Sequence, residues 1–418
     1  MSDPGTVKAG ARVAPRMSWR LLAITIGPAL VVMLADTEAG SVIAAAASGA
    51  EWGYRLVLPQ FLMTPALFMA QELAGRIGLV TRQGLAALVL HRLGRIPAAL
   101  LLATLVASCF GALVTELSGI AGVGEVFGIP VWESSTVAAA WLMAVVWTGS
   151  YRSTELIAIA VGLCELAFIG LAWLARPDPY ELLVQSVHFP LGEPGYLYLL
   201  AANFGTCVIP WAIFYQQSAS IDKGLTRTHL VSMRIETLAG AILCQTVTAA
   251  VVIAAAAAFG REKIEALDKV GDIAHAFTTS IGPTAGHAIF AIGLSGGALV
   301  AAIVVCLTAS WSFGEVLGLR HSLSESPAQA PWFYGAFTLV LAGGAMVVAS
   351  GVNLVQLAIA AGVANTLLLP VVLAFLWHAA RRDLPEDFRL RGFYAACVAT
   401  VLLLTAGLGV YAAVAGVL

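Results

Sequence analysis

The sequence Ala35-Asp36-Thr37-Glu38-Ala39-Gly40-Ser41 decides the fold class, because it places two carboxylates and two hydroxyls inside an apolar run from residue 21 to residue 50. Two ionisable side chains near the middle of a membrane-length segment are costly unless they face water, a partner or an ion. The small residues of the same stretch are compatible with an opened helix, which leaves backbone carbonyls without intrahelical partners. The pattern therefore predicts a cation site on a broken membrane helix.

The composition of the 418-residue chain is typical of helical membrane proteins. Hydrophobic residues make up 60% and charged residues only 11%, against roughly 25% charged residues in an ordinary soluble domain. The formal net charge is only -2, and the six cysteines lie in apolar runs without the spacing of a metal or redox motif. We therefore expect an all-α polytopic protein in the lipid bilayer, and nothing in the chain indicates binding to nucleic acid.

Eleven membrane spans are predicted from the recurring apolar runs. Their approximate ranges are 21–49, 54–75, 97–123, 133–149, 154–175, 197–218, 236–259, 284–316, 331–350, 353–378 and 392–416. The glutamates at 155, 165 and 315 lie in or at the ends of these spans, and we expect them to pair with arginines near the interface or to hydrogen-bond between helices.

The basic residues predict the orientation. Of the 22 lysines and arginines, only Arg55, Arg176, Arg261, Lys263 and Lys269 fall in segments on the side opposite to the N-terminus. Because cytoplasmic loops carry an excess of Lys and Arg, we expect a cytoplasmic N-terminus and an integral protein of a bacterial inner (plasma) membrane. The oligomeric state stays open, and a monomer is compatible with the sequence.

A second broken helix is predicted in the sixth span. Gly205 and Pro210 lie five residues apart in an apolar segment, and a proline removes an internal hydrogen bond, which frees carbonyls near Thr206. If spans one to five and six to ten are two repeats, the two interrupted helices occupy the same place in each half. Interrupted helices at corresponding positions are the best sequence pointer to a transporter's binding site.

These residues resemble the Nramp family of divalent-metal transporters. The resemblance rests on GPALVVMLADTEAGSVIAAAASGAEWGY at 27–54 and QELAGRIGLVTRQGLAALV at 71–89, and it extends more weakly through 115–130, 206–218 and 365–378. It implies a LeuT-like fold with two inverted five-helix repeats and one extra helix. The expected parts are a cytoplasmic tail at 1–20, a transport core at 21–380 with repeats at about 21–175 and 197–378, and a cytoplasmic loop with the eleventh helix at 381–418.

The resemblance also implies a set of metal ligands. The family's metal-binding Asp-Pro-Gly-Asn falls on residues 38–41, so Glu38 is the expected ligand acid and Ser41 stands where the family has Asn. The family's carbonyl-donating Ala falls on Thr206. Asp36 is expected as a second acid, although two residues earlier on a regular helix it points elsewhere. Freed carbonyls, including that of Ala35, complete the set.

Two positions in the sixth span bear on the choice of ion. The family's Met-Pro-His falls on Ile209-Pro210-Trp211, so the soft thioether is absent. Carboxylate, hydroxyl, carbonyl and water ligands suit hard Mg²⁺, Ca²⁺ or Mn²⁺. This departure resembles the Nramp-related magnesium transporter branch, which implies transport of Mg²⁺ and also Mn²⁺, with the ion as substrate and no cofactor.

The proton relay of the family is also reduced here. Trp211 occupies the position of the family's histidine, and residues 331–350 contain no Arg or Lys. The third span keeps Glu116, but Gly119 replaces the second acid. A relay without its titratable members cannot pass protons by the same route, so we expect facilitative transport that is not coupled to protons.

Two alternatives stay open at this point: a proton-coupled Mn²⁺/Fe²⁺ transporter, and an ion-coupled symporter of a small organic substrate on the same fold. No grouping of residues typical of an enzyme is present. Asn365 in the tenth span is a candidate for a contact around the site, and Gln216 is a candidate for lining the inner exit.

Overall fold

The computed structural model describes residues 27–259, 270–350 and 354–417, so the expected tail at 1–20 and the start of the first span lie outside the described residues. All regular secondary structure in the described ranges is helical. The helices are α2 (Pro28–Ala35), α3 (Ala39–Trp52), η1 (Gly53–Leu56), α4 (Val57–Thr81), α5 (Leu85–Leu93), α6 (Arg95–Val126), α7 (Val131–Thr148), α8 (Tyr151–Gly162), η2 (Leu163–Leu166), α9 (Ala167–Leu174), α10 (Pro179–Ser186), α11 (Pro194–Cys207), α12 (Pro210–Asp222), η3 (Arg227–His229), α13 (Leu230–Phe259), α14 (Val270–Ile281), α15 (Pro283–Leu317), α16 (Pro331–Ala349), α17 (Leu354–Arg382) and α18 (Gly392–Val417).

A helix lies at each of the eleven expected spans, although only nine segments of the described chain are both long and apolar enough to count as membrane spans. One of the nine, Ala39–Thr81, is 43 residues long and contains two expected spans. They are joined at Gly53, whose positive φ of 60° lets the chain turn. The expected fourth span is the 18-residue helix α7, which is not among the nine.

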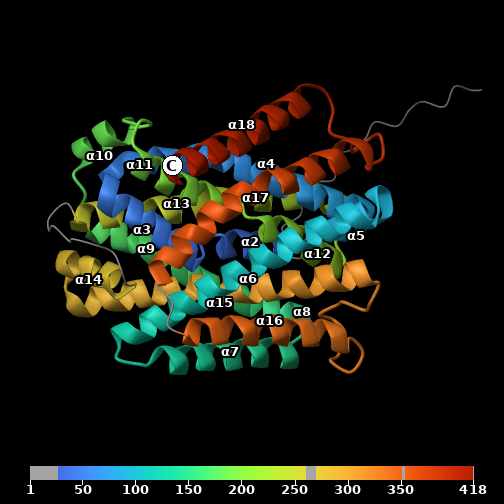
Figure 1. Ribbon diagram of the computed structural model, residues 1–418, viewed down its shortest axis with the longest axis horizontal. Coiled ribbons are helices and arrows are strands. Elements are labelled where there is room, and N and C mark those ends of the chain that lie inside the picture. The colour runs from blue at the N-terminus through green and yellow to red at the C-terminus, as the bar shows by residue number, and fades with distance from the viewer. Residues whose placement is uncertain (1–26, 260–269, 351–353, 418) are drawn as a thin grey trace, which may run out of the picture.

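The two broken helices, α2/α3 and α11/α12, pack against each other in the interior of the helix bundle (Figure 1). Helix α3 contacts α11, and α2 contacts α12, so the two interruptions come together. The long helices α6, α13 and α15 pack around them, whereas α7 and α16 lie together along one edge of the molecule (Figure 1). The fold therefore places both breaks inside the bundle, away from lipid.

Glycines allow the second broken helix to approach its neighbour closely. A side chain at Gly205 of α11 would come within 1.7 Å of the carbonyl oxygen of Gly362 on α17. The hydroxyl of Thr366, one turn further along α17, donates to the carbonyl of Ala201 at 2.7 Å. This contact fixes the end of α11 that leads into the break.

Candidate functional site

At the first break, a backbone N–H group donates to a side chain of another helix and not to a carbonyl of its own helix. Helix α2 ends at Ala35 and α3 begins at Ala39, with Glu38 extended between them. The Ala39 N–H donates to Oε2 of Glu116 on α6 at 3.0 Å, whereas in a continuous helix it would donate to the carbonyl four residues earlier. The Ala35 carbonyl thereby loses its usual donor and is able to bind a cation.

The second break opens because of a proline. Helix α11 ends at Cys207 and α12 begins at Pro210, with Ile209 extended between them. Pro210 has no N–H, so the Thr206 carbonyl has no donor at the usual position. The Thr206 hydroxyl donates to the carbonyl of Asn203 at 3.3 Å and is thus turned back toward α11. Of the Thr206 oxygens, the carbonyl is the better candidate ligand.

Glu38, Ser41 and Glu116 come together at the start of α3. Glu38 and Ser41 are buried, and the Ser41 hydroxyl donates to the Glu38 carbonyl at 2.9 Å, which leaves lone pairs of the hydroxyl oxygen available. Oε2 of Glu38 has no hydrogen-bond partner among the described residues. The carboxyl groups of Glu38 and Glu116 are neighbours. Glu116 is thus both a cap of α3 and a neighbour of the expected ligand acid.

Asp36 lies at the same break and is 1% exposed. Neither of its carboxylate oxygens has a hydrogen-bond partner in the described part of the chain. The thiols of Cys207 and Cys244 lie near the Asp36 carboxylate. Because Cys207 is the last residue of α11, the two breaks are close in space. A carboxylate held in this way requires a counter-charge or a proton.

Glu165 on η2 was expected to pair with an arginine or to hydrogen-bond another helix, and within the described residues it pairs with no arginine. It is 1% exposed and both of its oxygens lack a hydrogen-bond partner. It lies beside Thr37 and is close enough to Asp36 for the two carboxylates to repel each other. An acid in the interior of an apolar span is the sequence signal that makes Glu165 a candidate functional residue. By contrast, Glu155 pairs with Lys223 at 2.9 Å, and Glu315 accepts from Ser218 at 2.8 Å.

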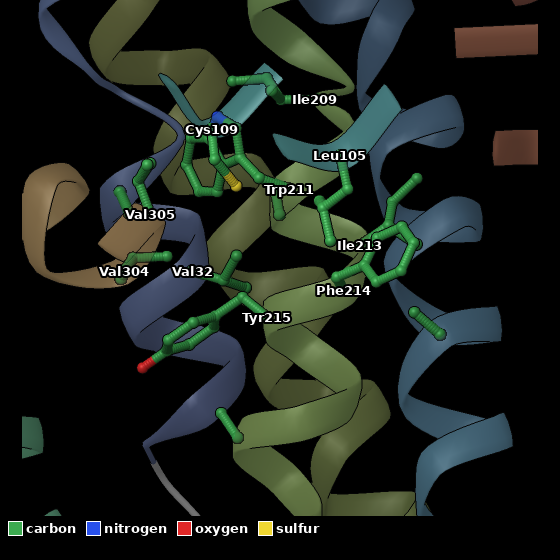
Figure 2. Close-up of a cluster of buried hydrophobic side chains, with 14 of the residues drawn as sticks. Val32, Leu105, Cys109, Ile209, Trp211, Ile213, Phe214, Tyr215, Val304 and Val305 are labelled. Atoms are coloured by element: carbon green, nitrogen blue, oxygen red, sulfur yellow. The ribbon is translucent and has the colours of Figure 1, made fainter. Parts of the chain in front are cut away.

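Ile209 and Trp211 belong to an apolar cluster beside the second break. Figure 2 shows them with Leu105 and Cys109 of α6 and with Val305 of α15. Both side chains are fully buried. The aliphatic side chain of Ile209 has no lone pair with which to bind a metal ion. It therefore packs beside the second break and excludes water there, but it supplies no ligand.

The two outlying candidates lie away from the breaks. Oδ1 of Asn365 on α17 accepts from the Ser108 hydroxyl of α6 at 2.9 Å, so its amide oxygen links two helices. Gln216 on α12 is fully buried, and neither of its amide atoms has a partner among the described residues. A side chain at Gly75 of α4 would lie 3.0 Å from the Gln216 amide nitrogen. Gln245 of α13, which the sequence reading did not single out, donates to the Cys207 thiol at 2.8 Å.

The donor set restricts how a metal ion is held. In the ranges that the structure describes, no three His, Cys, Asp or Glu side chains form a group that could hold a metal ion. An ion at the breaks would therefore be bound by at most two carboxylates, completed by carbonyls, hydroxyls and water. Mg²⁺ is commonly bound in this way, because it sheds its waters reluctantly.

The N-terminal end of α2 is held by three other helices. Oε1 of Glu236 on α13 accepts the N–H groups of Gly27 and Leu30 at 2.6 and 2.8 Å. The pair formed by Glu155 of α8 and Lys223, just after α12, lies directly against Gly27, where any side chain would overlap both groups. These contacts join the N-terminal end of α2 to α8, α12 and α13.

Comparison with known proteins agrees with this architecture. The chain is 26% identical over 438 residues to the divalent metal cation transporter MntH of Acidiphilium cryptum (strain JF-5), covering 98% of this chain and 96% of that protein. It is 27% identical over 392 residues to MntH of Verminephrobacter eiseniae (strain EF01-2), covering 88% of this chain and 84% of that one.

Solved structures show the same fold. The crystal structure of the Eremococcus coleocola manganese transporter superposes with a TM-score of 0.74 at 15% identity, over 97% of this chain and 89% of that chain. A Na⁺-coupled sialic acid symporter in a substrate-bound outward-open state superposes with a TM-score of 0.59 at 13% identity, over 95% of this chain and 88% of that one. The LeuT-like fold implied by the sequence is confirmed.

The sequence profile of the natural resistance-associated macrophage protein-like (Nramp) family matches residues 29–415, which is nearly the whole chain. Members of that family are transporters rather than enzymes, and they carry metal ions as substrates rather than as cofactors. The protein described here is an integral membrane protein that belongs to the Nramp family.

Proposed function

We propose that this chain transports divalent cations, Mg²⁺ foremost and Mn²⁺ also, down their electrochemical gradient and without coupling to protons. Transport of divalent metal is supported by relatives named as divalent metal cation transporters and by a structural neighbour described as a manganese transporter. The preference for Mg²⁺ and the absence of coupling rest on residues of this chain.

The observation that carries the proposal is the meeting of two helix breaks whose available donors are oxygens. The Glu38 carboxylate, the Ser41 hydroxyl and the Ala35 and Thr206 carbonyls are the proposed ligands, with Asp36 adding a second negative charge. All are hard donors, which favour Mg²⁺ and Mn²⁺ over softer, later metals. Retained waters complete the coordination shell of the ion.

Ile209 and Trp211 support the preference for a hard ion. The resemblance to the Nramp family places a methionine thioether and a histidine imidazole at these two positions. Here both are replaced by side chains that belong to an apolar cluster. A site that lacks sulfur and imidazole ligands gains nothing from binding a softer metal. Discrimination against Fe²⁺, Co²⁺ and Cd²⁺ follows.

The absence of proton coupling is inferred from the missing relay and from the position of Glu116. Trp211 does not titrate, and α16 contains no Arg or Lys. Oε2 of Glu116 accepts a structural hydrogen bond from the N–H of Ala39. The driving force is then the ion gradient together with the membrane potential, which contributes about 4.6 kcal/mol per 100 mV for a divalent ion.

In the proposed cycle the N-terminus is cytoplasmic and the protein lies in a bacterial plasma membrane. The inner end of α2 is closed by Glu236 and by the Glu155–Lys223 pair. Because an ion bound at the breaks is covered on that side, release requires α2 to separate from α8, α12 and α13, as in alternating access.

Proton-coupled Mn²⁺ transport is the second candidate, and one observation favours it. The carboxyl groups of Glu38 and Glu116 are neighbours, so a proton shared between them would be displaced by an incoming ion. The relatives named MntH agree with Mn²⁺ as an ion for this fold family.

Purified protein in liposomes separates the two candidates. Under an inside-negative potassium diffusion potential, a luminal magnesium dye should report Mg²⁺ entry while a luminal pH dye stays constant. A matched preparation of Glu38→Ala should show no entry of Mg²⁺ or Mn²⁺. Entry of Mn²⁺ alone with luminal acidification would support the second candidate, and entry of neither ion would exclude both.

A further inference from the structure

We propose a second cation site at the first helix break, formed by Glu165, the main-chain carbonyl of Thr37 and the Asp36 carboxylate. It takes a hard divalent cation, so that the transporter holds two ions at once. This inference depends on the proposed function in one respect, which is that the bound ion is the divalent cation that the protein transports. The site shares Asp36 with the proposed Glu38 site, whereas Glu165 and the Thr37 carbonyl belong to the second site alone.

The first argument is charge balance in the interior of the bundle. Four acids, Asp36, Glu38, Glu116 and Glu165, are each 3% exposed or less. None of them is in an ion pair with Lys, Arg or His in the part of the chain that the structure describes. Isolated buried charges are very costly, and one divalent ion compensates only two of these four carboxylates.

The second argument is the set of atoms without partners. Both oxygens of Glu165 and both oxygens of Asp36 are buried and lack hydrogen bonds within the described ranges. Buried polar atoms in native structures are nearly always paired, so unpaired ones call for an ion or a water that satisfies them. Four such oxygens at one helix break indicate a ligand rather than four separate defects.

The third argument is the close approach of α15 to the first break. Helix α15 has Gly297 at the point where it passes the break. A side chain there would lie 2.5 Å from the Thr37 carbonyl oxygen and 3.2 Å from Oε1 of Glu165. The Thr37 carbonyl oxygen and Oε1 of Glu165 therefore lie beside the same glycine of α15 and close to each other.

The location separates this site from the one at Glu38. Glu38 faces α6, where a side chain at Gly40 would meet both Glu38 and Thr115. Glu165 and the Thr37 carbonyl face α15. Asp36 is close to both Glu38 and Glu165, and with two free oxygens it can contribute one to each site.

The donors define the class of ligand. Two carboxylates and a carbonyl are hard oxygen donors, and their formal charge of about -2 matches a divalent cation. The thiols of Cys207 and Cys244 lie near Asp36, but each is already engaged, by Gln245 and by the Thr37 hydroxyl. They do not convert the site into one for a soft metal.

Ion counting tests the proposal. Full-length protein in lipid nanodiscs is equilibrated with radioactive Mn²⁺, and the bound ions per chain are measured by dialysis at saturation. Wild type should bind two, Glu165→Gln one, and Glu38→Gln one. Glu51→Gln, which removes an exposed acid on α3, is the matched control and should bind two. Unlabelled Mg²⁺ should displace both ions.

The proposal is overturned if wild type binds a single Mn²⁺, because the remaining acids are then neutralised by protons. It is equally overturned if Glu165→Gln still binds two. Should Glu165→Gln fail to fold, Glu165→Asp keeps the charge with a shorter reach and should weaken one of the two sites about tenfold; unchanged affinity at both sites counts against the proposal. Loss of flux with two ions bound would contradict the proposed function alone, whereas flux with one ion bound would contradict only this inference.

Discussion

Replacing Glu116 with Gln and with Ala separates a structural role from a proton-carrying one. Glu116 is fully buried, and its Oε2 accepts the Ala39 N–H that begins α3. Alanine leaves that N–H unsatisfied in the protein interior, which costs about 1–3 kcal/mol, a range similar to that for the loss of a helix cap. Glutamine keeps an oxygen acceptor of nearly the same reach. We therefore expect Glu116→Ala to be destabilised by about 2 kcal/mol and Glu116→Gln by much less.

The transport assay then gives the decisive contrast. If protons do not move with the ion, Glu116→Gln should keep Mg²⁺ flux within about tenfold of wild type, which corresponds to about 1.4 kcal/mol for the loss of one nearby negative charge. Unfolding in sodium dodecyl sulfate measures stability, and dye-loaded liposomes measure flux. A stable Glu116→Gln protein without any flux would refute this reasoning and would identify Glu116 as a proton carrier.

Three further predictions concern the breaks. Glu38→Ala should abolish flux while the protein stays folded, as judged by size-exclusion profile and thermal unfolding. Ile209→Met, a near volume-conserving change costing less than about 1.5 kcal/mol, should lower the apparent Kd for Mn²⁺ and Cd²⁺ in competition assays while leaving that for Mg²⁺ unchanged. Gly205→Ala should destabilise the protein by about 1–3 kcal/mol, because its side chain would meet the Gly362 carbonyl, whereas Gly111→Ala meets nothing within 4 Å and should be neutral.

Each of these has a result that would count against it. Normal flux in Glu38→Ala would place the ion elsewhere. An equal change for all three ions in Ile209→Met would mean that the side chain does not reach the ion. Equal stability of Gly205→Ala and Gly111→Ala would show that α11 and α17 do not pack closely at Gly205 and Gly362.

Both helix breaks could be predicted from the sequence, because their causes are local. Two acids within an apolar run and a Gly-Pro spacing in another run are visible without any knowledge of packing. The eleven helices could be predicted for the same reason, since apolar runs bounded by polar residues set their ends. The ends of the first two spans were predicted at residues 49 and 54, but only the structure shows that η1 joins α3 directly to α4 in one helical segment.

The contacts that complete the site could not be predicted, because they join distant parts of the chain. Glu116 caps α3 from a position 77 residues away, and which face of α6 it occupies depends on how that helix is rotated. Glu165 was expected to pair with an arginine or to hydrogen-bond between helices, and the absence of an ion pair among the described residues is visible only when the neighbouring helices are in place. Asn365 stays a candidate for a contact around the site, and its hydrogen bond with Ser108 of α6 could not be predicted because it joins residues 257 positions apart.

The potential at which net Mg²⁺ flux stops tests the central claim most directly, because it reports the charge that moves with each ion. In liposomes with known Mg²⁺ and proton gradients, uncoupled transport of a divalent ion predicts a shift of about 30 mV for each tenfold Mg²⁺ gradient. An imposed pH gradient should leave that potential unchanged. A potential that moves with the pH gradient would contradict the account, because it would show that protons travel with the metal.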